Sequence, residues 1–179
     1  MSTFVVEGGH PLSGSIRPAG NKNAALPCLC AAVLSAEPVV LHNVPKIRDV
    51  DTLLEVLQSV GADARWTGPN TVTVDASGVS VGRVDREQAA RIRGSLLLAG
   101  PLLGRFGKVE LPPPGGDVIG RRRMDTHFMA FEALGARVNL EGDFAIETEG
   151  LVGADMFLDE PSVTGTENAI MAAVTARGD

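Results

Sequence analysis

The residues best suited to chemistry lie in one short stretch, residues 112–123, which reads PPPGGDVIGRRR. Its glycines permit positive φ and a close approach of the backbone to a ligand, while its prolines stiffen the entry. Three consecutive arginines repel one another unless an anion lies among them. The stretch therefore predicts a mobile loop that closes over a phosphate or carboxylate and presents Asp117 to it.

A plainer interpretation of the same stretch is a surface turn. Asp117 would then form a local hydrogen bond with its own backbone, and the arginines would be solvated. The stretch alone leaves both interpretations open.

A second candidate anion site lies near the N-terminus. Lys22 and Asn23 follow a polar, glycine-bounded loop and precede an apolar segment, residues 24–35, whose large side chains recur at helical spacing. The free N–H groups of a helix N-terminus attract anions, and a neighbouring lysine strengthens the attraction. A solvated loop lysine is the alternative.

The charge distribution favours a small anionic ligand. The chain carries a formal charge of −6, yet residues 83–123 hold nine basic and four acidic side chains. A local positive site in an acidic protein suits a small anion better than a polyanion. The chain has no tyrosine and one tryptophan, so a base-stacking surface is disfavoured and we expect no nucleic-acid partner.

The two cysteines, Cys28 and Cys30, lie in an apolar run and are spaced C-x-C. This spacing without a suitably placed histidine is no zinc signature, so we expect buried free thiols, no metal and no cofactor. No signal peptide and no apolar run of about 18 residues is found. We therefore expect a cytoplasmic protein without a membrane partner.

Along the chain, we expect elements that recur. The first set is a short strand at residues 3–6, a helix at 24–35, a strand at 39–41, a helix capped by Asp49 or Asp51, and a hairpin at 63–75. Gly61 is the predicted stop of that second helix. Asp85 and Gln88 have capping-box spacing and predict one further helix, with Arg93 near its middle.

The second set repeats the first. A strand at residues 109–111 is followed by a helix capped by Asp125, then by a hairpin at 136–148. A third set begins with Thr164 and Glu167 at capping-box spacing, and its helix ends at Gly178. The sequence thus predicts an α/β fold of helix-strand-helix-hairpin units of about 70 residues, two complete and the third incomplete.

Five motifs, in order, resemble the UDP-N-acetylglucosamine enolpyruvyltransferase family of the EPSP synthase-like superfamily. They are GNKNAALP at 20–27, NVP at 43–45 with DVD at 49–51, RGS at 93–95, PGGDVIG at 114–120 with Asp125 and His127, and SVTGTEN at 162–168. The resemblance is collinear from Phe4 to Gly178. The related shikimate-pathway enzymes share the fold, but their GNAGT motif is absent here.

The resemblance implies a fold of two similar lobes, each an inside-out α/β barrel of three repeats with the active site between them. It places residues 1–19 in the second lobe and residues 20–179 in the first lobe, with two full repeats and the start of a third. A complete member of the family is more than twice as long.

The implied reaction transfers the enolpyruvyl group of phosphoenolpyruvate (PEP) to the 3′-hydroxyl of UDP-N-acetylglucosamine and releases phosphate. It is the first committed step of peptidoglycan synthesis, and so of cell-wall biogenesis, cell shape and division. The resemblance assigns Lys22, Arg93 and Arg122 to PEP. It assigns to the sugar nucleotide Asn23, Arg93, Arg122, Arg123, Met124, Asp125, Thr126, Ser162 and Val163.

The sequence departs from the family at two places. Asp117 stands where the family usually has a proton-donating cysteine, and an aspartic acid donates only if its pKa is raised, which nearby arginines oppose. Fosfomycin alkylates that cysteine, so we expect no covalent labelling here. Glu160 and Pro161 also differ from the commoner residues beside the nucleotide contacts.

The resemblance places the candidate base and further PEP-binding arginines in the second lobe. We therefore expect the isolated chain to be inactive unless a second lobe or another chain completes the cleft. An unfinished barrel exposes apolar surface, from which we expect self-association. The alternatives are a non-catalytic remnant that binds a nucleotide sugar or a protein and, disfavoured by the acidic charge, a relative that acts on RNA ends.

Overall fold

A computed structural model describes residues 3–80, 84–115 and 123–178 of the chain. The first repeat contains helices α1 and α2, a short 3-10 helix η1 and strands β1 to β3. Their bounds are α1 Lys22–Ala31, η1 Ala32–Leu34, β1 Val39–His42, α2 Arg48–Ser59, β2 Asp63–Gly68 and β3 Thr71–Asp75. The second repeat contains α3 Arg86–Ala90, η2 Arg93–Leu98, α4 Ala99–Phe106, β4 Lys108–Leu111, α5 Asp125–Ala133, β5 Arg137–Asn139 and β6 Phe144–Glu147, and α6 Val163–Ala173 opens a third.

Each repeat builds one three-stranded antiparallel sheet. The strand orders are β1-β3-β2 and β4-β6-β5, so the hairpin's second strand lies in the middle of each sheet. Equivalent positions pair alike, with Val39 opposite Val74 in the first sheet and Val109 opposite Ile146 in the second. The repeat predicted from the sequence, with its incomplete third copy, is confirmed.

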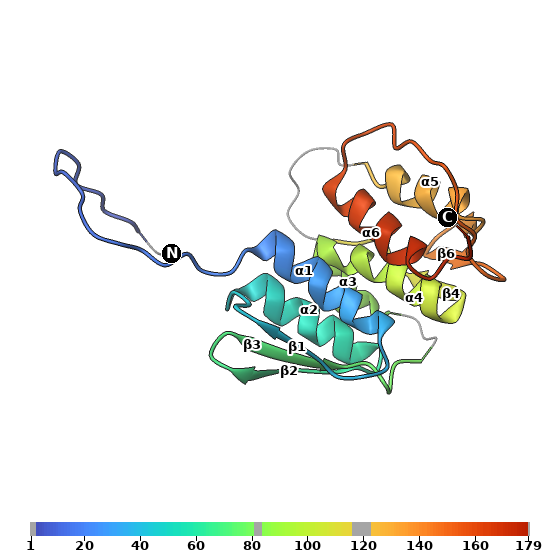
Figure 1. Cartoon of the computed structure of the whole chain (residues 1–179), viewed down its shortest axis with the longest axis horizontal. Coiled ribbons are helices and arrows are strands. Elements are labelled where there is room, and N and C mark those ends of the chain that lie inside the picture. The colour runs from blue at the N-terminus through green and yellow to red at the C-terminus, as the bar shows by residue number, and fades with distance from the viewer. Residues whose placement is uncertain (1–2, 81–83, 116–122, 179) are drawn as a thin grey trace.

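The helices occupy the interior and the sheets lie outside them. Figure 1 shows α1 and α2 over one face of the first sheet, with α4 and α6 stacked beyond them. Helix α2 illustrates why the helices lie inside, because its apolar side chains recur at helical spacing and are fully buried. They are Val50, Leu53 and Leu57. A single apolar core runs through both repeats.

Glycines follow the last helix of each of the first two repeats, α2 and α5. Gly61 and Gly135 have φ of 101° and 88°, in the left-handed region that suits a residue just beyond a helix. The stop at Gly61 was predicted from the sequence, and both glycines turn the chain into the following hairpin.

The predicted single helix after Asp85 is wrong. The Asp85 cap is confirmed, because its carboxylate accepts a hydrogen bond of 2.8 Å from the Gln88 N–H. The helix stops at Ala90, continues as the 3-10 helix η2 and resumes as α4. Gly94 favours helix poorly, and the ring of Pro101 would clash with the carbonyl of Leu97 in a continuous α-helix. Arg93 is consequently the first residue of η2.

Three predicted caps are displaced along the chain. Helix α2 begins after Ile47, α5 after Met124, and α6 after Ser162, whose hydroxyl accepts from the Gly165 N–H. The acidic side chains expected as caps of α2 and α5 lie in the first turn instead, where they still offset the helix dipole.

The N-terminal segment also differs from the prediction. Residues 3–6 form no strand, and residues 3–19 are exposed and extend away from the rest of the chain (Figure 1). A strand needs a partner for its backbone groups, and no described strand lies beside this segment. Cys30 is buried as expected, but Cys28 is exposed, so that half of the thiol prediction is wrong.

Within the described ranges, no helix is long and apolar enough to cross a membrane. Over the same ranges, no group of three or more histidine, cysteine, aspartate or glutamate side chains could hold a metal ion.

Candidate functional site: a cationic cavity between the helix ends

A cavity of about 870 Å³ lies where α1, α2, η2 and the start of α6 meet. Five cationic and three acidic side chains line it, so its charge is positive within an acidic chain. The lining residues are Lys22, Asn23, Leu26, Pro27, Arg48, Asp49, Thr52, Ala90, Arg91, Ile92, Arg93, Gly94, Leu97, Arg123, Glu160, Ser162, Val163, Thr164 and Glu167.

Helix α1 brings Lys22 and Asn23 to the cavity in its first turn. Asn21 caps the helix, since its side-chain oxygen accepts from the Ala24 N–H at 3.2 Å. The Lys22 ammonium lies 2.8 Å from the Asp49 carboxylate at the start of α2. This ion pair holds the lysine at the cavity wall, and an anionic ligand would compete with Asp49 for it.

Arg93 connects two walls of the site. It lies at the first residue of η2, and its guanidinium donates a hydrogen bond of 3.0 Å to the Arg123 carbonyl. Arg93 lies at the start of η2, and not in the middle of a helix, because the predicted helix is broken after Ala90.

Arg123 is surrounded by carboxylates. Its guanidinium bonds Asp125 bidentately and Asp159 at 2.7 Å, and lies 3.3 Å from Glu160. The hydrogen bonds that Arg123 donates to Asp125 and then to Asp159 raise the pKa of Arg123, and the bond accepted from Arg123 lowers the pKa of Asp125. Arg123 therefore ties the entry of α5 to the segment before α6, and its charge is already compensated within the chain.

The start of α6 forms the remaining wall. Ser162 caps the helix through the Gly165 N–H at 3.1 Å, while Val163 is largely exposed at the helix's first residue. A Cβ on Gly165 would lie 3.0 Å from the Ser162 hydroxyl and 3.1 Å from that of Thr126, so this turn packs closely on α5. Thr126 is fully buried, and among the described residues its hydroxyl has no hydrogen-bond partner.

The structure thus brings together six of the residues predicted from the sequence. Lys22, Asn23, Arg93, Arg123, Ser162 and Val163 all line the cavity. Met124, Asp125 and Thr126 lie beside Arg123 at the entry of α5 but do not line it. Asp117 and Arg122 lie outside the described residues.

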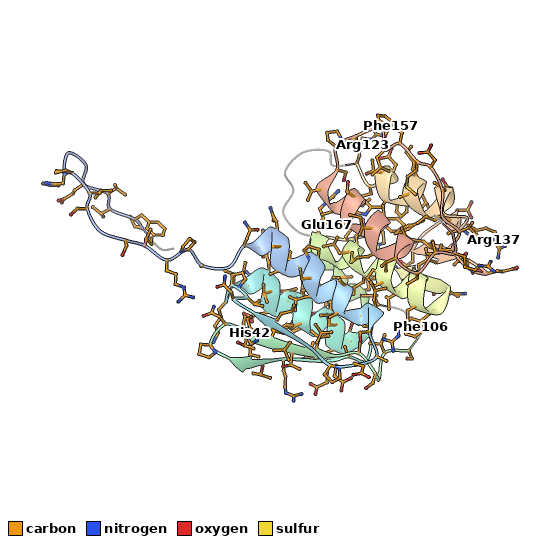
Figure 2. All side chains as sticks on the ribbon, viewed as in Figure 1. His42, Phe106, Arg123, Arg137, Phe157 and Glu167 are labelled. Carbon is orange, nitrogen blue, oxygen red and sulfur yellow. The ribbon has the colours of Figure 1, made fainter. Side chains whose placement is uncertain are left out.

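The cavity is also lined by residues that were not predicted as site residues, among them Arg48, Arg91, Thr164 and Glu167. Thr164 and Glu167 lie within a quoted motif and Arg48 is next to one, which was the signal available for these three. Arg91 bonds Glu55 and Gln88. Figure 2 shows Glu167 on the side of α6 toward α1 and Arg123 near the start of α5. Burial raises the pKa of Glu167.

The sequence from residue 6 to residue 179 matches the family described as EPSP synthase (3-phosphoshikimate 1-carboxyvinyltransferase). This chain belongs to the EPSP synthase family. The resemblance stated from the motifs is therefore confirmed at the level of the family.

Several curated proteins that are similar to this chain are named UDP-N-acetylglucosamine 1-carboxyvinyltransferase. The protein from Bradyrhizobium diazoefficiens is 58% identical over 175 residues, which are 98% of this chain and 41% of the relative. Those from Treponema denticola and Treponema pallidum are 50% and 53% identical, over 99% of this chain and 42% of each relative. The chain spans about two fifths of the length of these relatives.

Two solved structures confirm the α/β fold. The enolpyruvyl transferase NikO from Streptomyces tendae has a TM-score of 0.77 at 24% identity, over 96% of this chain and 41% of that chain. EPSP synthase from Acinetobacter baumannii has a TM-score of 0.70 at 15% identity, over 92% of this chain and 39% of that chain.

Proposed function

We propose that this chain forms part of an enzyme that transfers the enolpyruvyl group of PEP to the 3′-hydroxyl of UDP-N-acetylglucosamine. The names of the relatives at 43–58% identity support this reaction over others of the family. The observation that carries it is the cavity itself: six residues assigned from the motifs to these two substrates line one positive hollow.

Both substrates are rich in anionic oxygen, which suits the lining. Lys22 and Arg93 approach from different helices and would bind PEP together with Arg122. Asn23, Ser162 and Val163 would bind the sugar nucleotide, with Arg123, Met124, Asp125 and Thr126 shaping the adjoining wall. Preorganised cations of this kind stabilise charge as it moves from PEP to the leaving phosphate.

The reaction requires three proton movements besides binding. The sugar hydroxyl loses its proton and adds to C2 of PEP, while C3 gains a proton; the adduct then loses phosphate and a C3 proton. Asp117 is the proposed donor to C3. The chain carries only part of this machinery, so we propose that it is inactive alone and needs the second lobe or another chain. A cytoplasmic location stays a prediction.

The test is phosphate release from PEP and UDP-N-acetylglucosamine, with and without a separately produced second lobe. Release that requires both parts, and that Lys22→Ala lowers at least tenfold, is the expected result. Lys46→Ala is the matched control, because Lys46 is exposed and does not line the cavity. Release by the chain alone would contradict its proposed dependence on a partner.

Binding separates this proposal from the alternative of a non-catalytic remnant. If the chain is a remnant, the wild type and the Lys22→Ala variant should bind UDP-N-acetylglucosamine with the same affinity. Neither should release phosphate, with or without the second lobe. That pair of results would overturn the proposed enzyme.

A further inference from the structure

A chain of buried hydrogen bonds joins three helices behind the cavity. Asn168 of α6 is fully buried and His127 of α5 nearly so. The Asn168 side chain bonds the Gly100 N–H and the Leu96 carbonyl, and lies 2.8 Å from His127 Nδ1. His127 Nε2 in turn lies 3.2 Å from the Thr164 hydroxyl.

The partners fix the direction of every bond in this chain. The Gly100 N–H can only donate, so the Asn168 oxygen accepts and its NH₂ group donates, both to Leu96 and to His127. His127 Nδ1 must therefore be the acceptor, which leaves the ring hydrogen of a neutral imidazole on Nε2. Burial, with the charge of Arg93 second, lowers the pKa of His127 to about 4, so the ring is neutral near pH 7.

Thr164 is the end of this relay. Because Nε2–H donates to Thr164 Oγ1, the hydroxyl's own hydrogen must point away from His127. Thr164 is exposed and lines the cavity, and no described residue accepts that hydrogen. The hydroxyl lies in the first turn of α6, where backbone N–H groups also lack intrahelical partners.

We propose that the Thr164 hydroxyl is a hydrogen-bond donor to an anionic oxygen of the ligand in this cavity, and that His127 and Asn168 are its positioning residues. The inference rests on the proposed function, in which that oxygen belongs to the diphosphate of UDP-N-acetylglucosamine. A hydroxyl that already accepts one bond is oriented before binding and loses little freedom when the ligand arrives.

Titration with UDP-N-acetylglucosamine, of the chain alone and combined with the second lobe, tests the donor. Thr164→Val keeps the shape but removes the hydrogen, and we expect the Kd to rise roughly tenfold, as for a lost bond to a charged group. Thr164→Ser should stay within about twofold. Thr166→Val is the matched control, since that hydroxyl bonds the Ser162 carbonyl on the same helix and does not line the cavity.

The outcomes distinguish this inference from the proposed function. Binding by the wild type that Thr164→Val leaves unchanged would overturn the donor and leave the proposed function standing. A wild type without affinity in either arrangement would overturn the proposed function and, with it, the ligand named here.

Nitrogen-15 NMR of the imidazole tests the relay without any ligand. We expect His127 to carry its hydrogen on Nε2, and Asn168→Asp, which replaces the donating NH₂ by an acceptor, to move that hydrogen or add a second. The affinity measured in the titration should then fall together with the change of tautomer. A wild-type His127 protonated on Nδ1 would overturn the relay.

Discussion

At the scale of single residues, the cations of the cavity differ in what already compensates them. Lys22 has Asp49, Arg91 has Glu55, and Arg123 has three carboxylates. Arg48, at the start of α2, has no ion pair among the described residues. An incoming anion therefore meets Arg48 directly, whereas at Lys22 it competes with Asp49. This makes the wall of α2 as relevant as the predicted wall of α1.

Glu167 opposes an anionic ligand, because it is a carboxylate in the cavity without an ion-pair partner among the described residues. We predict that Glu167→Gln lowers the Kd for UDP-N-acetylglucosamine by roughly threefold, since it removes one like charge at partly screened distance. The gain in affinity over the wild type should shrink as the pH falls. The Glu167 carboxyl has a raised pKa, so in the wild type it becomes neutral at a higher pH than an ordinary carboxyl. Calorimetric titration at two pH values measures it.

The matched control is Glu132→Gln, which removes one exposed charge from α5 outside the cavity. It should leave the Kd unchanged. Equal effects of the two variants would mean that overall charge, and not the position of Glu167, governs affinity.

Burial of His127 predicts a loss of stability in mild acid. Its pKa is lowered from 6.5 to about 4 on folding, so the unfolded chain binds the proton more tightly. Stability from this residue is therefore complete above about pH 6.5 and falls as the pH drops, by roughly 2 kcal/mol near pH 5 and 3 kcal/mol below pH 4. Urea unfolding of the wild type and His127→Gln across this range measures the difference in slope.

The variant should start less stable, because it loses the bonds to Asn168 and Thr164, and should then lose less as the pH falls. Other groups titrate in both proteins and cancel in the comparison. Parallel curves would show that His127 keeps its ordinary pKa in the folded chain.

At the scale of elements, the seam between α4 and α6 depends on one glycine. A Cβ on Gly100 would lie 2.7 Å from the Asn168 carbonyl and 2.8 Å from its side-chain oxygen. The neighbour is the backbone of Asn168, which is fully buried in α6 and cannot rotate away. We predict that Gly100→Ala lowers the free energy of unfolding by roughly 2 kcal/mol, because the cost of overpacking exceeds the gain from the better helix propensity of alanine.

Gly104→Ala is the control on the same helix. The nearest atom to its Cβ would be the Thr175 hydroxyl at 2.5 Å, which belongs to an exposed side chain and can turn away if it gives up its hydrogen bond to the Ala172 carbonyl. It should change stability by less than about 1 kcal/mol. Chemical denaturation measures the unfolding free energy of both variants. Equal losses would show that contact with the Asn168 backbone is not the cause.

The elements themselves were largely predictable from the sequence, because their signals are local. Apolar periodicity located α2 and α5, and glycine stops placed the hairpins after them. The predictions failed where the decisive interaction is not local. Asp125 was expected as a cap, but in the structure it lies in the first turn and pairs with Arg123. The prediction of a strand at residues 3–6 failed because a strand requires a partner, and no described strand lies beside these residues.

At the scale of the whole molecule, the repeat was visible in the sequence but the site was not. Arg93 and Ser162 could be assigned only through the family's motifs. For Lys22, the predicted helix N-terminus suggested an anion site but left a solvated loop lysine open. The three residues come from three different units. The partners of Arg123 and His127 lie 36 and 41 residues away in sequence, at Asp159 and Asn168. No spacing rule relates such positions, because their distance follows from how the helices pack.

The N-terminal segment is the part least tied to the rest of the molecule. Phe4, Val5, Val6, Leu12 and Ile16 are between 84 and 98% exposed. No hydrogen bond or ion pair joins described residues 3–19 to the other described residues. Gly20 is the first residue in close contact, since a Cβ there would lie 1.7 Å from the Asn43 carbonyl.

We predict that deletion of residues 1–19 leaves the Tm within about 2 °C, because folding buries almost none of the deleted surface. Deletion of residues 1–21 should lower stability by about 1 kcal/mol more, because it removes the Asn21 cap of α1. Scanning calorimetry measures both. The shorter deletion should also weaken self-association in sedimentation velocity, since it removes five exposed apolar side chains. A large drop in Tm for the first deletion would mean that the segment packs against the lobe in solution.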